Sequence, residues 1–280
     1  MRLQAQGVNL AYDTRLIAED LTLSVPDGKV SVLIGPNGCG KSTALRSLAR
    51  LLPPRAGQVV LDGKSIQDTP TREVARRLAI LPQVLSAPEG ITIEDLVWFG
   101  RHPHRSSLKV PGERDREAVE WAMTVTGVAD MRDTHVDQLS GGQRQRVWIA
   151  LCLAQETDII LLDEPTTYLD VAYQLEVLDL LAALNKDHGT TVAMVLHDFN
   201  MAAEYADHIF VMSAGKLVAE GEPKDVLTPE LIQHVFQVES RVMEHPVSGK
   251  PLCIPVRGKR TSRPAPGRSP SAPAVTSGMR

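Results

Sequence analysis

Apolar and polar residues alternate in short runs over the first 34 residues of the chain. A period of two is typical of β-strands with one buried face. Asp27-Gly28 marks a turn, and the run VSVLI at residues 30–34 predicts a buried strand. One alternating run has its apolar side chains at Leu21, Leu23 and Val25. We therefore expect this part of the chain to form strands of an antiparallel layer.

The apolar spacing changes to that of a helix after a glycine-rich loop at residues 35–43. The helical positions are Leu45, Leu48, Ala49 and Leu52, and Pro53-Pro54 ends the run. From about Thr71 to Gln155 the pattern is mostly helical and has no clear strand. From Asp158 onward, strand and helix alternate through IILL, a helix with Val171, Leu175, Leu178 and Ala182, and TVAMVL.

This order of elements predicts an α/β fold with a mainly parallel sheet. A helical subdomain is expected as an insertion at about residues 84–155. The segment 242–254 predicts a hairpin about Ser248-Gly249. Residues 257–280 are rich in Pro, Ser, Gly and Arg and contain no acidic residue, so they predict a disordered tail behind a folded domain of residues 1–256.

The composition narrows the possible partners. A formal net charge of −4 over 280 residues gives no whole-chain attraction for nucleic acid, so any anion site must be local. The three cysteines, Cys39, Cys152 and Cys253, are too few and too widely spaced for a disulfide framework, as expected in a reducing compartment. No signal peptide and no apolar run of about 18 residues is present, so we expect that the chain does not cross a membrane by itself.

The loop GPNGCGKST fits the pattern G-x-x-x-x-G-K-[ST], in which backbone amides surround phosphate groups. The amino end of the following helix adds its positive dipole to the same anion. Lys41 is expected on the outer phosphates and the Ser42 hydroxyl on a magnesium ion. A plain glycine-rich turn is the alternative, but a strand and an amphipathic helix flank the loop as the pattern requires. The nucleotide-binding residues predicted here are Gly35, Pro36, Asn37, Gly38, Cys39, Gly40, Lys41, Ser42 and Thr43.

A second candidate segment is TDIILLDEP at residues 157–165, an apolar strand that ends in two carboxylates. Parallel α/β sheets bind ligands at the carboxyl ends of their strands. We assign Asp163 to the magnesium ion, through water, and Glu164 to the general base or to water positioning. Two surface acids at the end of a strand would be the simpler interpretation of this segment alone. The presence of the phosphate loop in the same chain disfavours it.

A third segment, DQLSGGQRQR, predicts a helix whose first turn carries two glycines. Ser140 is a good N-cap, and Gln143 three residues later can complete a capping box. A capping box alone does not require Gly141 and Gly142, each of which costs about 1 kcal/mol against alanine in a helix. The bare first turn therefore indicates a bound anion. Because Lys41 and Ser42 already account for this chain's own nucleotide, we expect this anion to be a different one.

The sequence LSGGQ resembles the signature of the ATP-binding subunits of ABC transporters. The resemblance implies a P-loop NTPase core and two subunits that meet head to tail, so that each signature helix caps the γ-phosphate bound by the other. It also implies ATP and magnesium as cofactors. On this basis Ser140, Gly141, Gly142 and Gln143 belong to a nucleotide site shared between two chains.

The same resemblance implies roles for four more residues. Gln83 matches the glutamine that senses the magnesium and the membrane partner. Asp170 matches an aspartate near the dimer interface, although TTYLD departs there from the usual SALD, which leaves the roles of Tyr168 and Leu169 open. His197 follows the strand TVAMVL and matches the histidine that contacts the γ-phosphate. Tyr12 is the candidate aromatic platform for adenine, with ordinary packing as its alternative.

The loop RHPHR carries His102 and His104, which could in principle bind a metal. Two histidines without a third ligand favour an ordinary surface loop instead. In the family, the helical subdomain contacts the membrane permease near this position. Contact with a permease is therefore the function that we expect for the loop.

Three functions remain possible at this stage. An energy-coupling ATPase of an importer is the first, with a homodimer, two permease subunits and an extracytoplasmic substrate-binding protein at the cytoplasmic face of the cell membrane. A soluble ABC ATPase is the second; the double cassette of ribosome types and the long coiled coil of chromosome types are absent, but an iron-sulfur assembly ATPase stays possible. A non-catalytic scaffold is disfavoured because every ATPase position is filled. No nucleic-acid partner is expected.

The resemblance extends beyond the ATPase motifs, over roughly residues 3–255. Over this range the amino-acid sequence is similar to that of ferric-siderophore importer ATPases, above all the ferric-enterobactin type. Cobalamin and haem importers, which share the architecture, are the closest alternatives. The similar segments are GPNGCGKST, GRHPH, LSGGQRQR, LAQETDIILLDEPTTYLD, VLHDFNMAAEYADH and HPVSGKPL.

Overall fold

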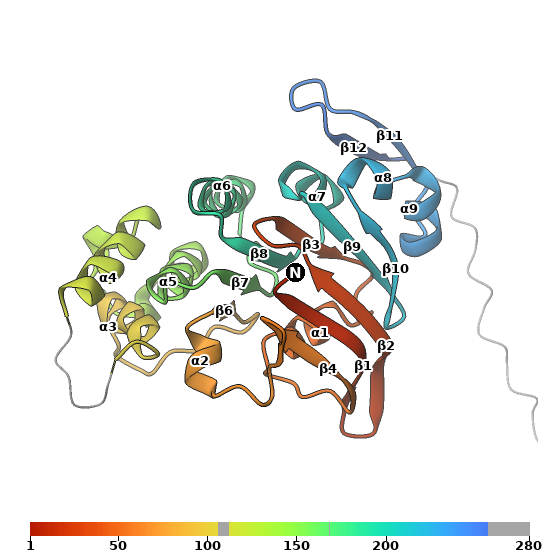
Figure 1. Cartoon of the computed structure of the whole chain (residues 1–280). Helices are drawn as coiled ribbons and strands as arrows, with labels where there is room; N and C mark the ends of the chain where they lie inside the picture. The colour runs from red at the N-terminus through yellow and green to blue at the C-terminus, as the bar shows by residue number, and fades with distance from the viewer. Residues whose placement is uncertain (106–111, 168, 257–280) are drawn as a thin grey trace, which may run out of the picture.

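The computed structural model describes residues 1–105, 112–167 and 169–256 (Figure 1). A six-stranded sheet forms its centre, in the strand order β10-β9-β3-β8-β7-β6. All neighbouring pairs are parallel except β10 and β9, which are antiparallel. The strands are β3 (Val30–Ile34), β6 (Leu78–Leu81), β7 (Ile159–Leu162), β8 (Thr191–Val195), β9 (His208–Ser213) and β10 (Lys216–Gly221). Every residue of β3, β7 and β8 is buried, which explains their unbroken apolar runs, because helices and a second sheet cover both faces.

Strand β6 lies in the segment for which the sequence predicted no strand. It pairs with β7 in parallel, from Leu78 opposite Ile159 to Leu81 opposite Leu162. The expectation was wrong because a run of only four apolar residues, LAIL, has no periodicity that separates a strand from a buried helical turn.

The predicted antiparallel layer is present as a second sheet, in the order β2-β1-β4-β5. Two of its strands, β1 and β2, lie within the first 34 residues, and two more follow the first helix. The third strand of the first 34 residues, β3, belongs instead to the central sheet, where it pairs in parallel with β8 and β9. The elements are β1 (Leu3–Tyr12), β2 (Arg15–Val25), β4 (Ala56–Leu61), β5 (Lys64–Ser65) and helix α1 (Lys41–Leu48). One apolar cluster joins Leu10 of β1, Leu45 of α1 and Phe210 of β9, so this layer and the central sheet share a core with α1.

The helical part of the chain lies beside β6 and β7, where α3, α4 and α5 pack together (Figure 1). Its elements are α2 (Thr71–Ala75), α3 (Ile93–Trp98), α4 (Glu113–Val125) and α5 (Gly141–Ala154), with short 3-10 turns at Phe99–Arg101, Ala129–Met131 and Val136–Gln138. Arg101, only 2% exposed, donates hydrogen bonds to Asp115, to Glu156 and to the carbonyl of Ala154. These bonds tie the start of α4 to the end of α5.

The remaining elements are α6 (Val171–His188), α7 (Phe199–Tyr205), α8 (Pro223–Val226), α9 (Pro229–Phe236), β11 (Ser240–Glu244) and β12 (Pro251–Pro255). Among them, α6 packs on β8, α7 on β3, and α8 on β9 and β10. Strands β11 and β12 form an antiparallel hairpin that lies near α7 and α8 (Figure 1). Within the part of the chain that the structure describes, no helix is long and apolar enough to span a bilayer. The tail predicted at residues 257–280 lies outside the described residues.

Candidate functional site

Three loops meet at the carboxyl ends of the neighbouring strands β3, β8 and β7. They are residues 35–40 after β3, residues 163–167 after β7 and residues 196–198 after β8. Because these strands are adjacent and parallel, their carboxyl ends lie at one edge of the sheet. The sheet therefore brings together three segments that the sequence analysis selected separately.

The phosphate loop needs glycine for steric reasons at its first position. A Cβ on Gly35 would lie 2.2 Å from the carbonyl oxygen of Met212 and 2.7 Å from the sulfur of Cys39. Gly40 has a φ of 106° and precedes α1, whose first turn receives no side-chain cap. The amides of that turn are therefore available to an anion.

Lys41 lies against this loop and is only 5% exposed. Its ammonium group donates to the carbonyl oxygens of Gly35, at 2.8 Å, and Pro36, at 3.2 Å. Cys39 is buried under the loop, and burial raises the pKa of its thiol. The side chain is therefore a neutral packing group within the loop.

Asp163 is 1% exposed, directly after β7. Neither carboxylate oxygen has a hydrogen-bond partner among the described residues, and Nε of Arg46 is 3.6 Å from Oδ2. Burial raises the pKa of Asp163, while the Ser42 hydroxyl and Arg46 act in the opposite direction. Two buried carboxylate oxygens beside a serine hydroxyl form a donor set suited to magnesium.

Glu164 accepts hydrogen bonds from three side chains of different loops. Its Oε1 is 2.8 Å from Nε2 of His197, and its Oε2 accepts from Nε2 of Gln83 and from Oγ1 of Thr167, each at 3.0 Å. Burial acts to raise the pKa of Glu164, but the bonds from His197, Thr167 and Gln83 outweigh it, and the net pKa is lowered. Glu164 is therefore ionised at neutral pH, as a group that accepts a proton or orients water must be.

The sequence analysis selected three members of this cluster and missed Thr167. Its signal was its position, three residues after the acid in EPTT, within reach of a side-chain bond. Arg46 was missed as well, although it lies on α1, one turn beyond the phosphate loop. Its guanidinium donates to the hydroxyl of Tyr12 at 3.3 Å. Tyr12, at the end of β1, is 40% exposed, so its ring remains accessible.

The predicted capping box is present at the start of α5. The Gln143 amide donates to Oγ of Ser140 at 3.3 Å, and the Ser140 amide donates to Oε1 of Gln143 at 3.0 Å. In the described structure a Cβ on Gly141 meets no heavy atom within 4 Å, and one on Gly142 makes only ordinary contacts at 3.6 Å or more. A side chain would thus fit at both positions, so packing among the described residues does not require glycine at either of them.

Three other predicted residues have local partners. Asp170 caps α6 by accepting from the Tyr173 amide at 3.1 Å. His104 lies 2.7 Å from the Gln155 carbonyl oxygen, and His102 packs edge-to-face on Phe99. Tyr168 lies outside the described residues.

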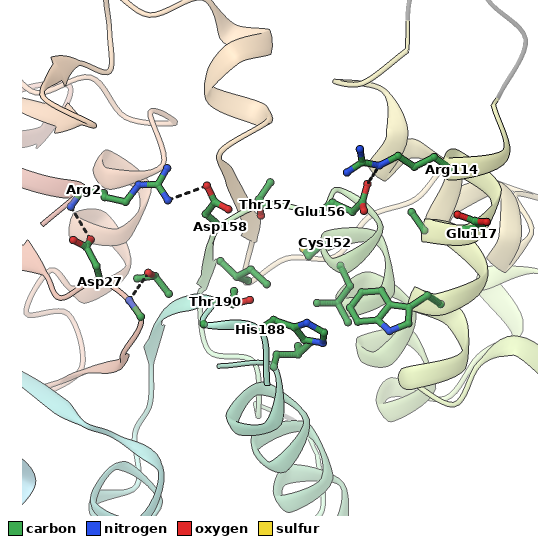
Figure 2. Close-up of a pocket in the computed structure, with 18 residues that line it drawn as sticks. Arg2, Asp27, Arg114, Glu117, Cys152, Glu156, Thr157, Asp158, His188 and Thr190 are labelled. Atoms are coloured by element: carbon green, nitrogen blue, oxygen red, sulfur yellow. Dashed lines mark hydrogen bonds and ion pairs between the residues drawn. The ribbon is translucent and has the colours of Figure 1, made fainter. Parts of the chain in front are cut away.

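A separate cavity of about 710 Å³ opens between the sheet and the helical part of the chain (Figure 2). It lies at the amino ends of the strands, since Asp158 precedes β7 and Thr191 begins β8. Figure 2 shows the Arg2–Asp158 ion pair on one side and the Arg114–Glu156 pair on the other. None of the predicted nucleotide-binding residues lines this cavity. We therefore do not assign the nucleotide to it, although it is large.

Comparison with known proteins also indicates a nucleotide-binding protein, as does the geometry at the carboxyl ends of β3, β7 and β8. The family model described as ABC transporter matches residues 18–167. The chain is 53% identical to the "Probable siderophore transport system ATP-binding protein YusV" of Bacillus subtilis (strain 168) over 90% of this chain and 92% of that protein. It is 48% identical to the ferric enterobactin transport ATP-binding protein FepC of Escherichia coli (strain K12), over 91% and 94%.

A solved structure shows the same fold. It is the dimeric bacterial ABC transporter cassette MJ0796, with a TM-score of 0.71 and 27% sequence identity over 79% of this chain and 98% of that one. With a family model that covers more than half of the sequence and relatives of this identity, the chain belongs to the ABC transporter family, as one of its ATP-binding, ATP-hydrolysing subunits.

Proposed function

We propose that this chain is the energy-coupling ATPase of an importer for ferric siderophores. The main support for ATP hydrolysis is the ionised Glu164, which accepts hydrogen bonds from three side chains and lies next to the buried Asp163 and the phosphate loop. The cargo part is supported by the names of the relatives, which transport siderophores or ferric enterobactin.

In this proposal, residues 35–43 hold the phosphates of ATP. Lys41 leaves the loop carbonyls for the outer phosphates, because an ammonium group gains more from phosphate oxygens than from neutral carbonyls. Tyr12 stacks on the adenine ring. Ser42 and Asp163 would hold magnesium, with Gln83 facing it, and the ion would neutralise charge on the phosphates.

Hydrolysis then requires an oriented water molecule. Glu164 accepts a hydrogen bond or a proton from the water that attacks the γ-phosphorus, and the bond to the ADP oxygen breaks. Thr167 and Gln83 hold the carboxylate in place. His197 moves its hydrogen bond from Glu164 to the γ-phosphate when ATP is bound.

The first turn of α5 completes the site of a second copy. Ser140, Gly141, Gly142 and Gln143 cap the γ-phosphate bound by the partner chain, and Asp170 lies near the interface. The open space around Gly141 supports this arrangement. The resulting homodimer associates with two permease subunits at the cytoplasmic face of the membrane, and an extracytoplasmic binding protein delivers the cargo.

The shared site predicts that damage crosses the interface. A Ser140→Arg chain paired with a Lys41→Ala chain places both lesions in one composite site and leaves the other intact. We expect ATP hydrolysis by this mixed dimer to exceed that of both single-variant homodimers. Differently tagged chains, purified as mixed dimers, allow the three rates of phosphate release to be compared. A mixed dimer no more active than the homodimers would contradict two independently working shared sites.

The cargo is tested by uptake. In a strain without redundant importers, deletion of the gene is expected to abolish uptake of labelled ferric siderophores under iron limitation. Cobalamin and haem uptake, measured in parallel, should be unchanged. Loss of cobalamin or haem uptake with normal siderophore uptake would contradict the cargo assignment, and co-purification with iron-sulfur assembly proteins instead of a permease would contradict the importer.

A further inference from the structure

The β11–β12 hairpin contacts α7 through an unusual side-chain bond. The side-chain amide of Asn200 donates to the Cys253 carbonyl oxygen at 3.2 Å and accepts from the Cys253 amide at 2.8 Å. Asn200 therefore pairs with β12 as a neighbouring strand would. Cys253 is only 2% exposed and belongs to the main apolar core, so both bonds are partly buried.

The free edge of β12 explains why this bond is available. Cys253 lies opposite Val242 of β11 in the antiparallel ladder. Its amide and carbonyl both bond to Asn200, so they point away from β11, as in a non-hydrogen-bonded pair. Without Asn200, two buried backbone groups would lose their partner.

Asn200 also lies in the first turn of α7, close in sequence to His197. Asp198, the N-cap of α7, accepts from the backbone amides of Asn200 and Met201, each at 2.8 Å. His197 directly precedes Asp198 and lies 2.8 Å from Glu164. A continuous path thus leads from β12 through the first turn of α7 to the catalytic carboxylate.

The far end of α7 is attached to the hairpin independently. Ser248 donates to the Glu204 side chain at 2.6 Å, and the Lys250 ammonium group donates to the Glu204 carbonyl oxygen. These contacts belong to the same hairpin–helix interface but lie at the other end of the helix. They supply a matched control for the contact near His197.

We propose that Asn200 is a positioning residue, which uses the edge of β12 to hold the first turn of α7 and thereby the His197 side chain against Glu164. The C-terminal hairpin is then part of the support of the ATPase site, through Cys253, which directly follows the segment HPVSGKPL. The inference rests on the role proposed above for His197.

The kinetic test compares three variants of the full-length chain. Asn200→Ala removes both bonds to Cys253, and Asn200→Asp keeps the acceptor but loses the donor. Both should lower kcat about ten- to a hundredfold, because small displacements of a reacting group have large effects on rate, while KM for ATP changes less than about twofold. Ser248→Ala should leave both constants unchanged. Thermal melting confirms that each variant is folded at the assay temperature.

A spectroscopic test reports on His197 without turnover. In chain labelled with ¹³C at the histidine Cε1 positions, the His197 signal is assigned by its absence from a His197→Ala sample. We expect Asn200→Ala to shift or broaden that signal and Ser248→Ala to leave it in place. An unmoved signal in folded Asn200→Ala chain, or equal changes in both variants, would overturn the inference. A moved signal with unchanged kcat would support the positioning by Asn200 and contradict the catalytic role of His197.

Discussion

Replacement of Glu164 by glutamine is expected to lower the rate of ATP hydrolysis about a hundredfold or more and to leave ATP binding intact, because general-base catalysis contributes about 10²–10⁴ in rate. Glutamine has nearly the same shape and can still accept from Thr167, but it cannot take a proton. It also removes the negative charge that faces His197. Phosphate release gives kcat, and titration with a fluorescent ATP analogue gives Kd.

This variant is expected to accumulate as a dimer with trapped ATP, which size-exclusion chromatography detects. Glu164 has a φ of 57°, and glutamine meets the same backbone requirement, so no new strain is introduced. Glu19→Gln, on the exposed face of β2, is a control with the same change of charge. Normal hydrolysis by the Glu164→Gln chain would contradict the role of this carboxylate.

Lys41→Ala is expected to raise the Kd for ATP about a hundredfold or more. The ammonium group is the cation that the phosphate loop itself contributes, and charged hydrogen bonds of about 1.5–3 kcal/mol account for a loss of this size. Isothermal titration with ATP and magnesium measures the change. In the same experiment AMP should lose less affinity than ATP, since it lacks the outer phosphates that Lys41 contacts.

Two measurements separate lost binding from lost structure. The Lys41→Ala chain without nucleotide should melt close to the wild-type temperature, since it loses only the two bonds to the Gly35 and Pro36 carbonyls. Lys29→Ala removes an exposed lysine from the turn before β3 and should bind ATP normally. A Kd within about threefold of wild type in the Lys41→Ala chain would contradict the assignment.

Much of the fold was predictable because the interactions behind it are local. The alternation around Leu21 and Leu23 predicted the antiparallel layer, and the runs VSVLI and TVAMVL predicted strands. The capping box of Ser140 and Gln143 spans only three residues, so its geometry follows from the helix start itself. Strand β6 was not predicted because its four apolar residues are too few to show a strand or helix period.

The candidate site was predictable in part, for a different reason. Lys41, Asp163 and Glu164 belong to segments whose residue types and order fit phosphate and magnesium chemistry. The partners of these residues were not recognisable in that way. Arg46 is an ordinary residue until the fold places it beside Asp163, whereas Thr167 bonds to Glu164 from three residues along the chain, a spacing that became informative only once Glu164 was selected.

The sequence by itself determined many of the elements, the phosphate loop, the two carboxylates and the helix start at Ser140, because residues within one turn or one strand decide each of them. Only the tertiary structure decided that Gln83 bonds to Glu164 across 81 positions, and that Asn200 bonds to Cys253 across 53. Such contacts depend on the order of strands in the sheet and on the docking of the hairpin. They arise from the burial of apolar surface over the whole chain, which no local pattern of residues encodes.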